Sequence, residues 1–233
     1  MSWFQLDPSS LANRSVSSVA VPSLSASVAR GTLGFTVVSL AGFAPWAVFG
    51  RWFHKAGGEL GMYIACAVVF IGLSGLCLHR LILGRGSLVR FYQLFSVAFT
   101  LYSVAWIAGW MALRGHPGSV VGLFAGTALM GWILVRAFEA RGQLLRVVMA
   151  LFVLNSVGYF VGGVVEGGLM RAQGMSILGV AIQKSTQARL AMLSWGLFYG
   201  LGFGAGLGLA FHWCQTEARA LIASRLPKPP ASI

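Results

Sequence analysis

Acidic residues are scarce in this chain, which has five Asp and Glu against 17 Lys and Arg in 233 residues. Charged residues make up only 9% of the sequence, whereas soluble domains carry about 25%. Because the apolar runs contain so few carboxylates, a proton relay or a cation pathway lacks its usual groups, which argues against proton-coupled transport and against most membrane catalysis. The net charge of +12 indicates contact with anionic lipid headgroups or with acidic partner subunits.

Cysteine and catalytic motifs are also sparse. Cys66, Cys77 and Cys214 lie within or at the ends of apolar runs and form no CxxC pair, so no disulfide framework is predicted. The sequence has no GxSxG, HExxH or P-loop motif, and its GLGFGAGLG run lies inside an apolar span with no strand before it. Basic residues are scattered without forming a stripe, which makes nucleic acid a poor partner. We therefore expect neither enzymatic activity nor a metal site.

Long apolar segments are what the chain has in abundance, and hydrophobic residues make up 57% of it. A helix of about 20 residues crosses a hydrocarbon core of about 30 Å. The predicted fold is all-α: a polytopic integral membrane helical bundle of about six transmembrane helices, forming one domain over residues 33–213. The spans are expected near 33–50, 60–83, 91–113, 118–135, 144–165 and 190–213.

Two segments flank this domain. Residues 1–32 are rich in Ser and Val and are broken by Pro8 and Pro22, which predicts an extended or interfacial segment. Residues 214–233 are expected to form a basic C-terminal tail. The longest connection, 166–189, contains the run SILGVAIQ, for which a short interfacial helix is expected.

The distribution of basic residues predicts the orientation. Six spans place both termini on one side of the membrane, where eleven Lys and Arg flank the spans, against six on the other side. By the positive-inside rule, both termini are expected in the cytoplasm. We expect a protein of this topology to be integral to a bacterial inner (cytoplasmic) membrane.

Glycine recurs at four-residue intervals in two spans. The rows are Gly196, Gly200, Gly204 and Gly208 in the sixth span, with Gly202 and Gly206 beside them, and Gly118, Gly122 and Gly126 in the fourth. Residues at this spacing share one helix face, and without side chains that face admits a neighbouring backbone or a flat, rigid ligand. Because the fourth and sixth spans run in the same direction, we expect these two helices to touch, within one chain or across a dimer.

The fifth span carries the polar stripe of the predicted bundle. Asn155, Tyr159 and Glu166 are spaced i, i+4 and i+11 and share a face. Polar groups inside a membrane need partners, which makes these three residues a candidate polar site. The alternative is structural: Asn155 forms an interhelical hydrogen bond, for which Ser194 and Ser103 are the candidate partners, and Glu166 reaches headgroup water.

Two histidines are candidate cofactor ligands. His79 and His212 lie at the inner ends of the second and sixth spans and so share a leaflet. Either could ligate the central metal of a haem or chlorophyll beside the Gly row. Alternatively, both are interfacial residues that bind headgroups or helix-end carbonyls. No motif requires a cofactor; bound lipid is expected, and haem, chlorophyll and quinone are further candidates.

Two functions are consistent with these features. The first is a non-catalytic structural or accessory subunit of a larger membrane protein complex, such as a respiratory or photosynthetic energy-converting complex. It would pack through its Gly-rich faces against other membrane subunits or a copy of itself, and would hold lipid, quinone or pigment. The alternative is a small-molecule transporter or channel with a site on the fifth span, which a continuous polar cavity reaching mid-bilayer would favour.

Overall fold

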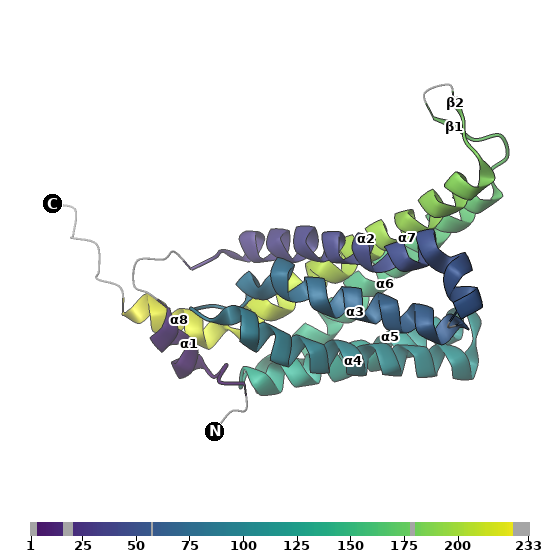
Figure 1. Cartoon of the computed structure of the whole chain (residues 1–233). Helices are drawn as coiled ribbons and strands as arrows, with labels where there is room; N and C mark the ends of the chain where they lie inside the picture. Colours follow the sequence, from purple (N-terminus) through teal and green to yellow (C-terminus); the bar gives the residue numbers. More distant parts are fainter. Residues whose placement is uncertain (1–3, 16–20, 57, 178–179, 226–233) are drawn as a thin grey trace.

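The computed structural model describes residues 4–15, 21–56, 58–177 and 180–225. Within these residues the chain forms a bundle of long helices, with two short helices packed at one end (Figure 1). Six of the described helices are long and apolar enough to cross a membrane. The prediction of an all-helical bundle with six candidate membrane spans is confirmed, and these spans indicate a membrane location.

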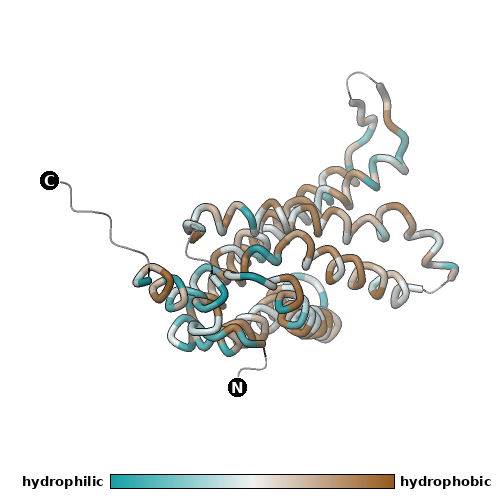
Figure 2. The backbone as a smooth tube through the Cα atoms, turned by 60° about the vertical axis from the view of Figure 1, so that its left-hand side comes forward, coloured by the Kyte–Doolittle hydropathy of each residue, from teal (hydrophilic) through white to brown (hydrophobic). Residues whose placement is uncertain are grey.

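The long helices follow one another along the chain. They are α2 (Leu24–Ala56), α3 (Gly58–Leu78), α4 (Ser87–Leu113), α5 (Gly115–Ala137), α6 (Leu144–Arg171) and α7 (Lys184–Cys214). The short helices are α1 (Pro8–Arg14) and α8 (Thr216–Ser224), and two 3-10 turns, η1 (His79–Leu81) and η2 (Arg141–Gln143), lie in the connections. Figure 2 shows hydrophobic residues along the long helices and hydrophilic residues gathered toward the ends of the bundle, as a membrane-spanning bundle requires.

Several helix boundaries differ from those expected. Helix α2 begins at Leu24 rather than near residue 33, because the Ser23 hydroxyl accepts a hydrogen bond from the Ala26 amide at 3.2 Å and so caps the first turn. Helix α6 continues to Arg171 and α7 begins at Lys184, so both extend into the predicted loop.

The rest of the connection between α6 and α7 contains two short antiparallel strands. These are β1 (Ser176–Ile177) and β2 (Val180–Ala181), paired as Ser176 with Ala181 and Ile177 with Val180. The expected interfacial helix in this segment is therefore wrong. A helix of this length is marginal alone, and the backbone of the segment is paired in extended form instead.

Helices α1 and α8 pack together at one end of the bundle (Figure 1). Asp7 caps α1 by accepting a hydrogen bond from the Ser10 amide at 2.9 Å, and Arg225 donates to the Asn13 side-chain oxygen at 2.9 Å. Arg219 on α8 donates to a backbone carbonyl oxygen just before α2, and burial lowers the pKa of its guanidinium. The N-terminal segment, expected to be extended or interfacial, thus contains a helix tied to the C-terminal end of the bundle.

Aromatic rings from α2, α4 and α7 form the middle of the core. Phe35 packs edge-on against Phe203 with ring centroids 4.9 Å apart, and Phe203 stacks on Tyr102 at 5.0 Å. All three rings are buried. Because these rings come from helices that are not neighbours in sequence, the layer holds the hairpins of the bundle together.

Candidate functional site

The Gly row of α7 lies directly on α2. A Cβ atom added to Gly208 would stand 2.6 Å from the Ser27 carbonyl oxygen, and one on Gly204 would stand 2.5 Å from the Gly31 carbonyl oxygen. The backbones of α2 and α7 are therefore in contact, and no flat ligand separates them. Gly202, offset beside the row, meets the backbone of α6 just as closely.

Helices α5 and α7 make a small contact, but their Gly rows do not face each other. A Cβ atom on Gly122 would stand 2.6 Å from the Trp106 carbonyl oxygen, and Gly118 and Gly126 also face α4. Helices α4 and α5 are joined through Arg114 alone, so they form a tight antiparallel hairpin that covers the α5 row. Each Gly row thus packs against an antiparallel neighbour within one chain.

Helices α2 and α7 separate toward the end of the bundle opposite α1 and α8. At Gly200, an added Cβ atom would still meet backbone, 2.7 Å from the Thr36 Cα. One turn nearer the opposite end, at Gly196, it would meet the ring of Phe43 at 3.2 Å instead. The two helices therefore touch through backbone atoms near α1 and α8 and are separated by side chains toward the opposite end. We call this diverging pair of helices the fork.

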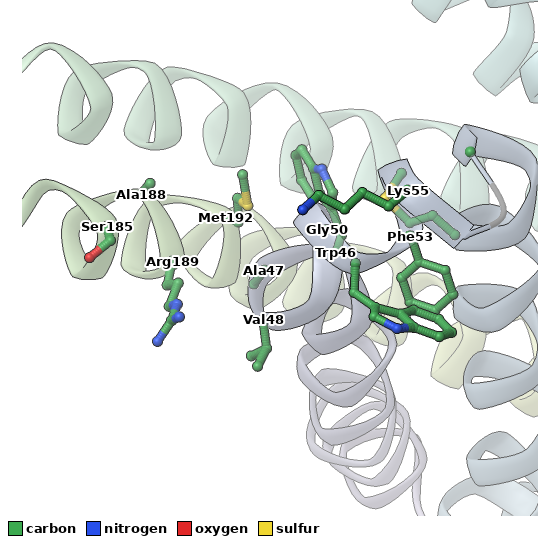
Figure 3. A pocket seen from close by; sticks show the side chains of 13 residues that line it. Trp46, Ala47, Val48, Gly50, Phe53, Lys55, Ser185, Ala188, Arg189 and Met192 are labelled. Atoms are coloured by element: carbon green, nitrogen blue, oxygen red, sulfur yellow. The ribbon is translucent and has the colours of Figure 1, made fainter.

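Beyond this layer the fork opens into a groove of about 850 Å³ between α2, α3 and α7 (Figure 3). Its inner end is lined by Trp46, whose ring packs against Trp195 with centroids 5.9 Å apart. Pro45 lies inside α2 just before this point, and proline bends a helix because it lacks an N–H donor and clashes with the preceding turn. Figure 1 shows the last turns of α2 leading away from α7.

The groove combines apolar walls with two cations. Its lining includes Trp46, Trp52, Phe53, Met192, Lys55 and Arg189. Lys55 lies near the end of α2 and Arg189 in the second turn of α7, so the charges come from different walls (Figure 3). Both side chains are exposed and form no hydrogen bond or ion pair with the described residues. Such a lining suits an amphiphile with an apolar body and an anionic group.

Asn155 on α6 is fully buried, at 0% exposure. Its side-chain nitrogen donates to the Tyr102 hydroxyl at 2.8 Å, and the Tyr199 hydroxyl donates to the same oxygen at 3.2 Å. The partner of Asn155 is thus a tyrosine on α4, not the expected Ser194 or Ser103. The side-chain oxygen of Asn155 has no hydrogen-bond partner among the described residues. This triad joins α4, α6 and α7 by polar contacts inside the core.

The other two candidates on the fifth span lie outside this triad. The Tyr159 hydroxyl is 3.2 Å from the Ser119 hydroxyl on α5, and the Tyr159 carbonyl oxygen accepts from the Trp195 indole at 3.0 Å. Glu166 is half-buried and forms no hydrogen bond or ion pair with the described residues. Asn155, Tyr159 and Glu166 therefore share a helix face without converging on one site.

The two candidate histidine ligands contact protein groups at the end of the bundle near α1 and α8. His79 Nδ1 lies 3.0 Å from the Gly75 carbonyl oxygen within its own helical segment, and His212 Nδ1 lies 3.2 Å from the Ser27 hydroxyl on α2. Over the described part of the chain, no group of three or more His, Cys, Asp or Glu could hold a metal ion.

Sequence patterns did not single out the groove. Its residues come from three segments, and the signals that border it, Pro45 and the aromatic and basic residues after it, resemble the ordinary end of a membrane span. Comparison of this chain with protein-family models, with curated proteins and with solved structures finds no match.

Proposed function

We propose that this protein is a non-catalytic subunit of a larger membrane assembly, in which it holds an amphiphilic lipid in the groove between α2, α3 and α7. The observation that carries the proposal is the groove itself, a volume of about 850 Å³ beside Trp46, Trp52 and Phe53. An empty apolar hollow forfeits dispersion contacts along its walls, so filling it stabilises the bundle. The bilayer supplies acyl chains for this purpose at high local concentration.

The orientation that we propose puts the groove at the outer surface of a bacterial inner membrane. The excess of Lys and Arg beside the spans on the side of the termini supports a cytoplasmic location for both termini. The groove lies at the end of the bundle opposite α1 and α8 and would then face the outer leaflet.

Association with partner subunits would use the outer helix faces, because the Gly rows are covered within the chain. Helix α3 offers such a surface: Tyr63, Ile64, Val68 and Leu76 are large apolar side chains that stay exposed. In a membrane these side chains meet lipid or the helix of another subunit, which can be a second copy of the chain.

A small-molecule transporter or channel with a site on the fifth span is the less supported function. Its site would need an opening to Asn155, which is fully buried and bound to Tyr102. The ring of Phe203 stacks on Tyr102 and packs against Tyr199, so a substrate would have to displace the centre of the core.

The test is extraction from native membranes in a gentle detergent, followed by sizing, visible absorption and native mass spectrometry of the same peak. We expect the chain to co-migrate with other membrane subunits and to retain lipid. Visible absorption identifies haem or chlorophyll, and extraction of the peak identifies quinone. A lipid-free monomer or homodimer would contradict the proposal and would direct the next experiments to transport assays.

A further inference from the structure

We infer that the groove is selective for an anionic phospholipid, whose phosphate group binds between Lys55 and Arg189 and whose acyl chain lies against Trp46 and Met192. This inference rests on the proposed function, because both concern the same groove. It goes further by naming the headgroup charge as the property that is recognised. It also excludes neutral quinones as the preferred occupant.

The charge of the lining carries the inference. The two charged side chains among the described lining residues, Lys55 and Arg189, are both cationic. They come from α2 and α7, the two walls of the fork (Figure 3), and neither forms an ion pair with the described residues. A phosphate diester accepts charge-assisted hydrogen bonds from both, whereas a quinone or a fully apolar molecule would leave both cations without a counter-charge.

The apolar part of the groove fits the other end of a phospholipid. Trp46, Val48 and Met192 line it toward the middle of the bundle, while Lys55 lies toward the end of α2, where the span meets the headgroup region. A volume of about 850 Å³ is within the range of about 300–1,000 Å³ that is typical of ligand pockets. A second apolar hollow of about 400 Å³ shares Trp52 and Phe53 with the groove and can take a second chain.

Bilayer phospholipid is the source to which we commit. The groove lies at the end of the membrane spans, so a lipid of the surrounding leaflet can enter it sideways without leaving the membrane. Aromatic rings such as Trp52 are typical of the headgroup level, where an amphiphile presents both of its ends.

The experiment uses the full chain in detergent and native mass spectrometry, with phosphatidylglycerol and phosphatidylcholine of identical acyl chains as competing probes. We expect phosphatidylglycerol to be retained preferentially. The double variant Lys55→Gln with Arg189→Gln should lower that preference about tenfold, since each basic residue near an anionic surface contributes several-fold to its attraction. The matched control is Lys184→Gln with Arg171→Gln, which removes the same charge at the same end of the bundle from residues outside the groove.

A third variant separates failure of this inference from failure of the proposed function. Met192→Trp fills the groove without changing its charge and should displace both lipids, with an unfolding midpoint that shows the bundle intact. Suppose that Met192→Trp loses both lipids. If the parent chain then binds the two headgroups equally, or if the two double variants behave alike, the headgroup selectivity alone would be overturned. Unchanged lipid retention in Met192→Trp would overturn occupancy of the groove and, with it, the proposed function.

Discussion

Replacement of Gly204 by alanine tests the contact between α2 and α7. The added methyl group would stand 2.5 Å from the Gly31 carbonyl oxygen and 2.9 Å from the Thr32 Cα. Non-bonded carbon atoms pack at about 3.5–4.0 Å, so the helices must separate by about 1 Å to admit it. The atoms with which it collides are backbone, which cannot rotate away as a side chain can.

The cost follows from two opposing effects. Overpacking of this kind destabilises a core by about 1–3 kcal/mol, while replacing a helical glycine by alanine favours the helix by about 1 kcal/mol. The difference between these effects is a net loss of up to about 2 kcal/mol. Gly163→Ala on α6 is the matched control: its Cβ would meet nothing within 4 Å, so that variant should be slightly more stable than the parent chain.

The assay is thermal unfolding of both variants in one detergent, at matched protein concentration. A loss of up to about 2 kcal/mol in a chain of this size lowers the midpoint by up to about 8 °C, whereas Gly163→Ala should leave it unchanged or raise it. If Gly204→Ala unfolded at the midpoint of Gly163→Ala or above it, the close backbone contact between α2 and α7 would be refuted.

Three further variants test polar contacts by the same unfolding assay. Asn155→Leu removes the donor to the Tyr102 hydroxyl and should cost about 0.5–2 kcal/mol; a stabilised variant would contradict a structural role for the triad. Gln215→Leu should cost about 2–4 kcal/mol, because Gln215 is buried, accepts from the Leu83 amide at 2.8 Å and donates to two backbone carbonyl oxygens. An unchanged midpoint would show that water replaces those bonds. Glu166→Gln should change stability by less than about 0.5 kcal/mol, since the carboxylate has no partner among the described residues; a larger loss would reveal an interaction of the charge.

The Gly rows show which features of helix packing can be predicted from the sequence and which cannot. Four-residue spacing predicts faces that can admit another backbone, because the absence of a Cβ atom is a property of each residue and its position on a helix. The two helices that carry the rows make only a small contact, and each row packs against another helix, α4 or α2. Close packing depends on which helices are neighbours, and the short link at Arg114 made α4 the neighbour of α5.

The polar stripe gives a similar result. Its position on one face of the fifth span followed from helical periodicity, and a membrane environment required a partner for Asn155. That partner, Tyr102, looked in the sequence like one more aromatic residue of an apolar span. A hydroxyl group on an aromatic ring gives no periodic signal, and only the arrangement of the helices in the bundle brings it within reach of Asn155.

The sequence by itself determined that this chain folds as a helical bundle with six apolar spans, because span length and composition are local properties that the bilayer thickness selects. It also determined the Gly faces and the excess of cations. The tertiary structure alone decided where those faces pack and that α2 and α7 diverge past Phe43 into a groove with Lys55 on one wall and Arg189 on the other. A groove formed by three distant segments depends on helix crossing and on the bend after Pro45, and these are set by packing between helices rather than by any one stretch of chain.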